Sequence, residues 1–344
     1  MAKKKAAIEV QFNWVFVMVA GALILVFFFG IVQKQRELSQ AKISNSLLTN
    51  IESIATGAGV SQGTVQTVAL PNVGIDFECT EECLCTYSIE QVRKEYKDRI
   101  VFAPRLLKAT EVMLWTLDWK VPFRATNFVY ATTSKDKYFF IYDNENSVLL
   151  KKFNKTIPPE VNSQFVHISQ YGKLKNENYN SVKFIFVDTS APIPADLGVD
   201  RSFRKVDVGG IYINSAGDVH FYDKVSKRTL SFQKVESSYF GEPTIYGAVF
   251  AADSNAYECN MISALSRMGN ILELYVERTK ELDNLNNVGS FCSEGYSTTN
   301  IEDLQGVADT AYKDTKQIKA LSTPVSALNS QNEGLLRASC PLLY

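Results

Sequence analysis

An uncharged apolar segment near the N-terminus restricts the fold of this chain more than any other feature. Residues 12–32 read FNWVFVMVAGALILVFFFGIV and include no charged side chain. As an α-helix rising about 1.5 Å per residue, this segment spans roughly 31 Å, the thickness of the hydrocarbon core of a bilayer. Lipid offers no partners for backbone polar groups, so a spanning segment of this kind must be helical. We therefore expect one transmembrane helix over residues 12–32.

A cleaved signal peptide is the alternative interpretation of the same segment. The apolar run is longer than the core of a usual signal peptide, and no A-x-A-like cleavage site follows it. An uncleaved anchor is therefore expected. Residues 3–5 are all lysine, which favours a cytoplasmic tail over residues 1–11. Basic residues just after the helix weaken that bias, so the orientation needs a second argument.

The cysteines supply that argument. All of them follow the apolar segment, and their number is even: Cys79, Cys83, Cys85, Cys259, Cys292 and Cys340. In an oxidising compartment this predicts up to three disulfides. A metal site at the first three is the alternative, but no histidine is nearby and C-x2-C spacing is absent. Asn154 begins the only N-x-S/T sequon, a possible glycosylation site. We expect a single-pass protein of the cell membrane with its C-terminal domain outside.

Residues 33–56 are expected to extend the membrane helix as a membrane-proximal helix. Its apolar positions form one stripe on a helical face: Ile43, Leu47, Ile51 and Ile54. Such a stripe must rest on protein, either the chain's own folded domain, which we prefer, or the same stripe of a neighbouring copy. The glycine-rich run over residues 57–64 is expected to break the helix and form a joint.

The remainder predicts an α+β fold in two parts. Residues 57–253 read as a β-rich ectodomain, and residues 254–344 as a C-terminal helical hairpin whose first helix covers about 255–286. Strands are expected at 64–70, 73–77, 99–102, 112–119, 127–132, 138–142, 165–169, 182–187, 210–213, 219–222, 230–235 and 244–251. Two hairpins are predicted among them, one joining 127–132 to 138–142 and the other joining 210–213 to 219–222. Residues 148–153 read as a short helix, and Pro324 is expected to interrupt the last helical arm.

Helix geometry predicts one disulfide. Cys259 lies near the start of the helix over 255–286 and Cys292 just past its end, about 40 Å away if the helix is straight. A disulfide needs Cα atoms within about 7 Å, so these two cannot pair. A second arm over 301–337 running back antiparallel would bring Cys340 to Cys259. Cys292 would then pair with Cys79, Cys83 or Cys85.

No catalytic, cofactor or metal motif stands out in the sequence. His167 and His220 lie in strand-like patterns without a nucleophile beside them, so structural roles are expected. The best small-site candidate is Asp188, which follows an apolar strand, because polar groups at strand ends bind ligands in α/β sheets. The alternative is a turn that Asp188 caps.

The N-terminus carries a family resemblance. Three lysines, then Ile8-Glu9-Val10-Gln11-Phe12-Asn13-Trp14 and an apolar helix, resemble uncharacterised archaeal membrane-anchored surface proteins, and more loosely type IV pilin-like proteins. The pilin-like resemblance implies a subunit or accessory protein of a surface filament.

Three functions follow as expectations. The first is a non-catalytic membrane-anchored extracellular protein acting by protein–protein contacts, and the second is the pilin-like subunit. The third is an anchored enzyme or ligand-binding receptor. The expected partners are the bilayer and other membrane or surface proteins, including further copies of the chain. A net charge of −1 argues against nucleic acid as a partner.

Overall fold

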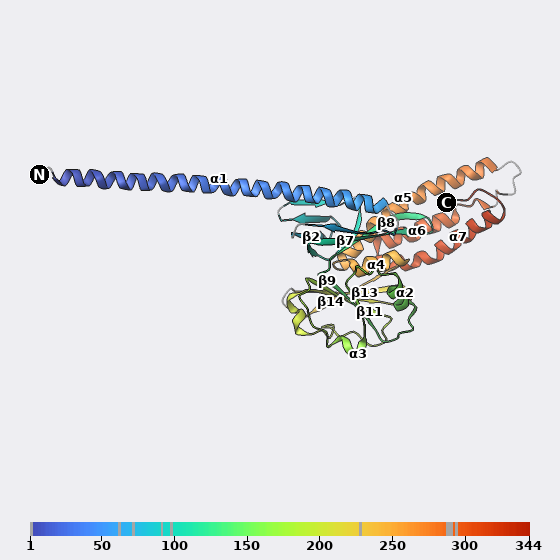
Figure 1. Ribbon diagram of the computed structural model, residues 1–344. Helices are drawn as coiled ribbons and strands as arrows, with labels where there is room; N and C mark the ends of the chain where they lie inside the picture. The colour runs from blue at the N-terminus through green and yellow to red at the C-terminus, as the bar shows by residue number, and fades with distance from the viewer. Residues whose placement is uncertain are drawn as a thin grey trace.

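The computed structural model describes residues 3–60, 63–70, 73–90, 92–96, 99–226, 229–286, 292 and 295–344 (Figure 1). The predicted α+β class is confirmed, with an N-terminal apolar helix, a β-rich middle and C-terminal helices. Helix α1 (Lys3–Val60) is unbroken, so the expected extension of the apolar helix past residue 32 is confirmed, whereas the expected break at Gly57 is wrong. Within the described residues, Trp14–Gln35 is the one stretch long and apolar enough to cross a membrane.

The far end of α1 docks on the folded body. Leu48 is fully buried and Ser44 nearly so, and Lys94 Nζ donates to Thr49 Oγ1 at 2.8 Å. The helix therefore rests on its own domain, as the sequence favoured. The side chains of the predicted stripe lie outside the described residues: Ile43, Leu47, Ile51 and Ile54.

Two four-stranded sheets lie face to face beside α1. The first has the order β1 (Val65–Ala69), β7 (Glu111–Lys120), β8 (Arg124–Thr132), β5 (Ile100–Phe102). The second has the order β4 (Val92–Glu95), β3 (Cys85–Ile89), β2 (Gly74–Cys79), β6 (Leu106–Lys108). Every pairing in them is antiparallel except that of β5 with β8.

The third sheet has six strands and a parallel half. Its order is β10 (Ser163–His167), β9 (Asp136–Tyr142), β11 (Ser181–Val187), β12 (Asp207–Ile213), β13 (Asp218–Lys224), β14 (Phe232–Ser238). The first four strands are parallel, and α2 (Val148–Thr156) makes the crossover from β9 to β10. Helix α3 (Ile168–Tyr171) lies between β10 and β11, and η1 (Arg201–Lys205) lies between β11 and β12. The predicted β12–β13 hairpin is confirmed.

Two predictions about this region are wrong. Strand β9 forms no hairpin with β8 but pairs in parallel with β10 and β11, and its nearly continuous burial is typical of parallel strands covered on both faces. The expected strand at 244–251 is helix α4 (Glu242–Phe250). Pro243 at its start favours a helix, and because the segment is buried on all sides its apolar run shows no helical period.

The C-terminal part has three long helices rather than the two of a helical hairpin. They are α5 (Ser254–Asn286), α6 (Thr299–Lys313) and α7 (Ser322–Arg337), with η3 (Thr315–Leu321) between the last two. The interruption falls at Asp314, which caps η3 through Lys316 N, whereas Pro324 sits harmlessly in the first turn of α7. Hydrogen bonds from Ser237 and Ser238 to Thr315 hold η3 on β14.

The disulfides pair Cys79 with Cys85, Cys83 with Cys259, and Cys292 with Cys340. The prediction of three disulfides is confirmed, but the predicted Cys259–Cys340 pair is wrong, as is the pairing of Cys292 with the N-terminal cluster. The third helix, α7, explains the error. Helix α6 returns toward the start of α5, and α7 then runs outward again, so Cys340 reaches the far end of α5 beside Cys292.

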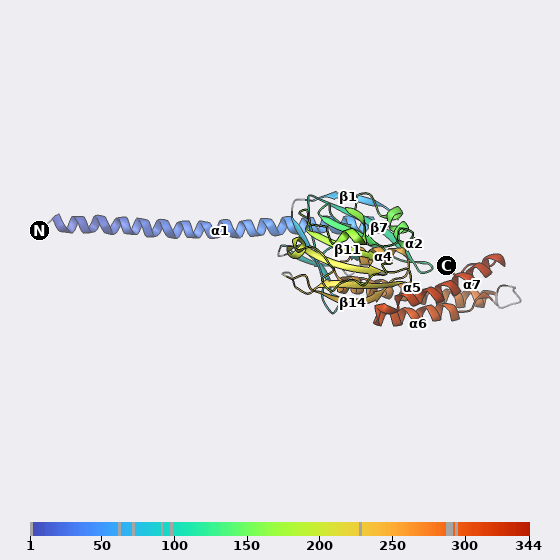
Figure 2. The ribbon, with the colours of Figure 1, turned by 90° about the horizontal axis from the view of Figure 1, so that it is seen from below.

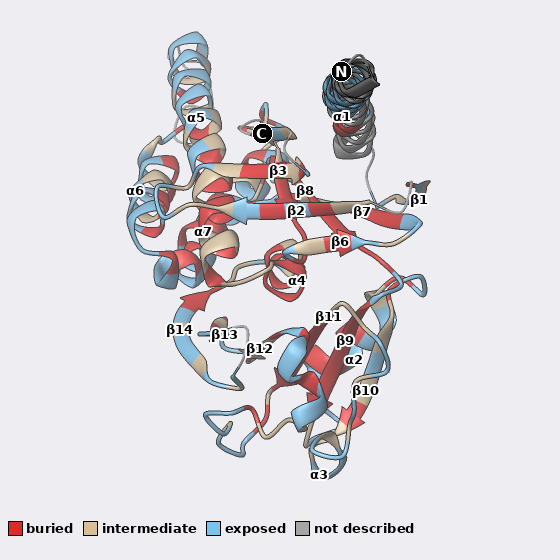
Figure 3. Cartoon of the chain, turned by 90° about the vertical axis from the view of Figure 1, so that its left-hand side faces the viewer, coloured by how far each residue is buried: buried red, intermediate tan, exposed pale blue. Residues whose placement is uncertain are grey.

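Buried side chains form three apolar layers, since alternate residues of each strand face opposite sides (Figure 3). The outer layer fills the space between the two four-stranded sheets and takes Val129 and Ala131 from β8. The central layer lies between β8 and the six-stranded sheet, around α2, α4 and α5, and takes Tyr130 and Phe140. The third layer covers the opposite face of the six-stranded sheet and takes Phe139.

The molecule has two ends. Helix α1 leaves the body on one side, and α5, α6 and α7 project together on the other (Figures 1 and 2). The apolar stretch and the helical arm formed by α5, α6 and α7 therefore lie at opposite ends of the long axis.

Candidate functional site

Asp188, the predicted small-site residue, lies at the carboxyl end of β11 with a positive φ of 48°. Its carboxylate accepts hydrogen bonds from Ser147 Oγ at 2.7 Å, Ser215 N at 2.7 Å and Ser215 Oγ at 2.8 Å. Ser147 also caps α2 by accepting from Leu150 N at 3.2 Å. Asp188 thus joins the start of α2, the end of β11 and the β12–β13 turn.

A second carboxylate lies at the same edge of the sheet. Asp143, directly after β9, accepts from Ser190 Oγ at 2.6 Å and from Ser190 N at 2.7 Å. The Ser190 hydroxyl bond is the main reason why the pKa of Asp143 lies below its usual range. The chain turns to opposite sides after β9 and β11, and such switch points bind ligands in many α/β sheets. Here both acids are held by donors of the chain itself.

The two histidines have structural contacts. His167 Nδ1 accepts from Ser169 N at 3.3 Å and so caps α3. His220 stacks on Tyr212 with ring centroids 5.4 Å apart, and burial lowers its pKa. Strands β9, β11 and β12 separate the strands that carry them, so the fold does not bring the two together.

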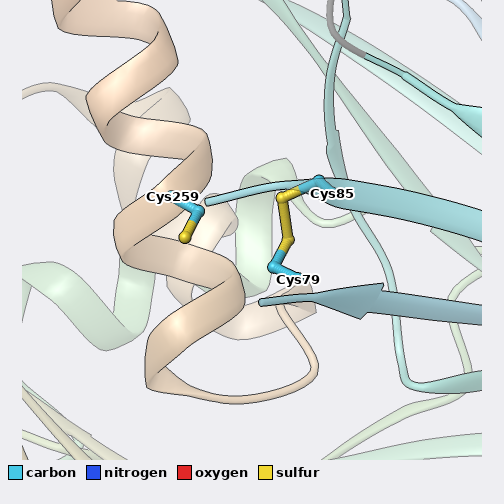
Figure 4. Close-up of side chains that lie close together, drawn as sticks. All are labelled: Cys79, Cys85 and Cys259. Atoms are coloured by element: carbon cyan, nitrogen blue, oxygen red, sulfur yellow. A yellow bond between two sulfur atoms is a disulfide. The ribbon is translucent and has the colours of Figure 1, made fainter. Parts of the chain in front are cut away.

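Four cysteines gather where the β2–β3 hairpin meets α5 (Figure 4). The Sγ atoms of Cys79, Cys85 and Cys259 lie within 4.8 Å of one another, and Cys83 is bonded to Cys259. A metal binds cysteine as a thiolate, and sulfurs in disulfides carry no such charge. Asn255 Nδ2 donates to Cys79 O at 2.8 Å, which adds to the contact. The cluster therefore fastens the hairpin to the helix.

A groove that sequence reasoning missed lies between α5 and α6 on the helical arm. Its volume is about 230 Å³. Helix α5 lines it with Leu265, Ser266, Gly269, Asn270 and Glu273, and α6 with Gln305, Ala308, Asp309 and Tyr312. We call these residues the arm groove. A Cβ added at Gly269 would meet no atom within 4 Å, so the groove is open above that residue.

The arm groove left one signal in the sequence. A glycine inside a helix costs about 1 kcal/mol relative to alanine. Gly269 and Gly306 in amphipathic helices therefore indicate helix surfaces that have a packing or binding role. The exposed side chains of the groove are mostly polar or acidic, including Glu273 and Asp309, and Tyr312 is 46% exposed. Tyrosine is enriched in protein–protein interfaces, so the exposed ring of Tyr312 is the feature of the groove that favours a contact site for another protein.

Elsewhere on the arm, large apolar side chains face solvent. Leu274 is 70% exposed, Leu285 81% and Leu336 63%. Leu274 and Leu285 are three helical turns apart on α5 and share one face. Such side chains are common singly on monomers, so the arm groove is the stronger candidate.

Comparisons with known proteins add no family to this geometry. No protein-family model, curated protein or solved structure matches the chain. The argument for a function therefore rests on the chain's own residues.

Proposed function

We propose that the chain is a single-pass membrane protein whose folded body stands outside the cell and binds another protein, without catalysis, through the arm groove. One observation carries this proposal: the apolar stretch and the helices that line the arm groove, α5 and α6, project from opposite sides of the body (Figure 1). Anchored through the apolar stretch, the molecule holds α5 and α6 on the side of the body away from the bilayer.

The apolar stretch supports the anchor. Trp14–Gln35 has a mean hydropathy of 3.0, and none of it is buried by the fold. Exposing so large a continuous apolar surface to water is strongly unfavourable, and a bilayer removes it from water. The three disulfides support an oxidising exterior for the body.

The charge of the arm supports a basic partner. Helices α5 and α6 together hold eight acidic and four basic residues. Two of the acids, Glu273 and Asp309, line the groove. Complementary charge favours a partner segment that carries lysine or arginine, and it speeds the encounter.

A photocrosslinking experiment tests this proposal. A benzoylphenylalanine placed at Asn270, inside the groove, should crosslink to a partner on intact cells. The same residue at Glu281, which is exposed on α5 but does not line the groove, is the matched control. Reversing both groove charges, Glu273→Lys with Asp309→Lys, should abolish the crosslink while leaving the thermal midpoint nearly unchanged, because both side chains are exposed.

Equal crosslinking at Asn270 and Glu281, or a crosslink that survives the double reversal, would show that the groove is not the contact site. Membrane-impermeant protease applied to intact cells tests the orientation separately. Survival of fragments beyond residue 60, while known outer proteins are digested, would place the body inside.

A filament subunit is the second candidate. The observation that favours it is that α1 is one unbroken helix whose stretch Trp14–Gln35 is exposed and apolar and whose later part docks on the body at Leu48. Such a helix can pack against copies of itself outside a membrane as well as cross one. Sedimentation of sheared surface filaments decides between the two, because a subunit appears in the filament fraction and an anchored protein stays with the membranes.

A further inference from the structure

Two disulfides lie side by side where the β2–β3 hairpin meets α5. We call Cys79, Cys83, Cys85 and Cys259 the cysteine cluster. Figure 4 shows Cys259 of α5 beside the Cys79–Cys85 disulfide, and the Sγ atoms of these three residues lie within 4.8 Å of one another. A disulfide bond is about 2.05 Å long, so Cys259 Sγ has to move about 3 Å at most to bond to a sulfur of the other disulfide. Rotation of a side chain between staggered rotamers covers such a distance. The two disulfides are therefore placed to exchange.

Burial decides which sulfur of the Cys83–Cys259 disulfide an external thiol reaches. Cys83 is half-buried in the turn between β2 and β3, beside the exposed Leu84, whereas Cys259 is 1% exposed. In thiol–disulfide exchange the attacked sulfur forms the new bond and the other sulfur leaves as a thiolate. An incoming thiolate therefore bonds to Cys83 and releases the Cys259 thiolate inside the protein.

One sulfur of the second disulfide accepts a hydrogen bond. Tyr96 Oη lies 3.6 Å from Cys79 Sγ, and because a disulfide sulfur carries no proton, the tyrosine hydroxyl is the donor. Burial raises the pKa of Tyr96 to about 12, so the hydroxyl keeps its proton at neutral pH. A donor beside a sulfur stabilises its thiolate and makes it the better leaving group. When Cys259 attacks this disulfide, Cys85 is therefore the attacked sulfur and Cys79 the leaving one.

We propose that the cysteine cluster is a thiol-exchange site for an external dithiol, in which Cys259 passes from Cys83 to Cys85. One thiolate of the dithiol attacks Cys83 Sγ, and the Cys83–Cys259 bond breaks with its electron pair leaving on Cys259. The Cys259 thiolate attacks Cys85 Sγ, and the Cys79–Cys85 bond breaks with its electron pair leaving on Cys79. The second thiolate of the dithiol attacks the dithiol sulfur bonded to Cys83, which closes the oxidised dithiol and releases the Cys83 thiolate. Cys79 and Cys83 take up the two protons that the dithiol lost.

The product keeps the hairpin fastened to α5. The dithiol has lost two electrons and the chain one disulfide, but Cys85–Cys259 now joins the same two elements that Cys83–Cys259 joined. Entry at the other disulfide gives the same product: a dithiol that bonds to Cys79 releases the Cys85 thiolate, which attacks Cys259 Sγ and releases Cys83. The exchange uses no residue of the arm groove, so it stands apart from the proposed contact site.

Limited reduction of the full chain in detergent tests the proposal. The folded chain is treated briefly with one equivalent of dithiothreitol, quenched with excess N-ethylmaleimide and digested for non-reducing peptide mapping. We expect the main two-electron product to contain a Cys85–Cys259 link, with Cys79 and Cys83 alkylated. Tyr96→Phe removes the donor to Cys79 and should lower the ratio of Cys85–Cys259 to Cys79–Cys259 links about fivefold, the effect of about 1 kcal/mol. An unchanged ratio would overturn the assignment of Cys79 as the leaving sulfur.

A pair of variants tests the exchange without any reductant. Cys83→Ser leaves Cys259 without its partner, so part of the chain should carry a Cys85–Cys259 link. Cys292→Ser is the matched control, because it frees Cys340 beyond the other end of α5 and should leave both disulfides of the cluster unchanged. If Cys83→Ser fails to fold, the limited reduction of the natural chain decides alone.

Two results would overturn the exchange. In the first, Cys259 is recovered only as the alkylated thiol or in its bond to Cys83, with no link to Cys79 or Cys85. In the second, Cys292→Ser rearranges the cluster as much as Cys83→Ser does, which would assign the new links to scrambling during digestion.

Discussion

The outer and central apolar layers share strand β8 but are packed differently. The central layer is built on helices and aromatic rings: Trp115 contacts Tyr246 with centroids 4.6 Å apart, and Tyr138 contacts Phe250 at 5.0 Å. The outer layer joins two sheets through mostly aliphatic side chains and contains a cavity of about 40 Å³, which Leu107 and Ala131 help to line. A helix adapts its rotation and position to fill a layer, whereas the separation of two sheets is set by their largest facing side chains. Small side chains between sheets therefore leave space.

The largest expected effect concerns the disulfide that connects the two layers. Cys83 and Cys259 are 176 residues apart, and the chain-entropy model assigns such a closure about 5 kcal/mol of stability. The Cys79–Cys85 closure spans 6 residues and is worth about 2 kcal/mol. Cys83→Ser with Cys259→Ser should therefore destabilise the chain more than Cys79→Ser with Cys85→Ser in equilibrium urea unfolding. Equal losses would mean that the hairpin does not depend on its link to α5.

A matched pair of truncations compares the layers directly. Phe140→Ala in the closed central layer should cost about 4 kcal/mol, because its neighbours cannot collapse into the space. Leu107 lines the cavity in the outer layer, and Leu107→Ala should cost about 2 kcal/mol, since its surroundings already have room to relax. Urea unfolding measures both. A loss at Leu107 as large as that at Phe140 would contradict the idea that the outer layer is loosely filled.

Stability should also depend on pH, because the acid Asp136 is buried where the chain passes from β8 to β9. Asp136 follows β8 and is 1% exposed. Burial raises its pKa to about 7, although Thr133 and Thr132 donate hydrogen bonds to Oδ2. Its Oδ1 has no partner among the described residues.

The folded state therefore favours the protonated acid, whereas the unfolded chain releases that proton near pH 4. Folding takes up a proton between pH 4 and 7, so the contribution of Asp136 to stability falls as pH rises through that window, by at most about 4 kcal/mol. Asp136→Asn should flatten this part of the pH profile, measured by urea unfolding from pH 5 to pH 8. An unchanged slope in the variant would assign the dependence to other groups.

The smallest effect concerns the polar edge of the six-stranded sheet. Ser147→Ala removes both the cap of α2 and one donor to Asp188, and should cost about 1 kcal/mol. Ser330→Ala on α7, whose hydroxyl bonds only its own helix at Ser326 O, should change stability by less than about 0.5 kcal/mol. Equal stabilities of the two variants would mean that the hydrogen bonds of Ser147 do not stabilise this edge of the sheet.

Local patterns in the sequence were enough for the apolar stretch, helix α5 and the β12–β13 hairpin. Each depends on residues close together in the chain, through uniform apolarity, a helical period, or a turn between two short strands. Asp188 was likewise predicted to lie at the end of its strand. In the structure its carboxylate accepts hydrogen bonds from Ser147 and Ser215.

Other features depend on distant partners and could not be predicted. The apolar run of β9 is compatible with a hairpin or a parallel sheet, and only β10 and β11 decide between them. The path of Cys340 depends on the turn at η3, which hydrogen bonds to Ser237 and Ser238 hold in place. The arm groove and the cavity in the outer layer arise from the spacing of separate elements, which no single segment encodes.

The continuity of α1 has a mechanical consequence. A body attached by a flexible tether would tumble, and its binding surface would sample every direction above the bilayer. In the proposed membrane-anchored arrangement, a helix that is unbroken between Trp14 and the docked Leu48 transmits the tilt of the apolar stretch to the body. As the anchored molecule diffuses laterally, its body would meet neighbours at a nearly constant height and angle.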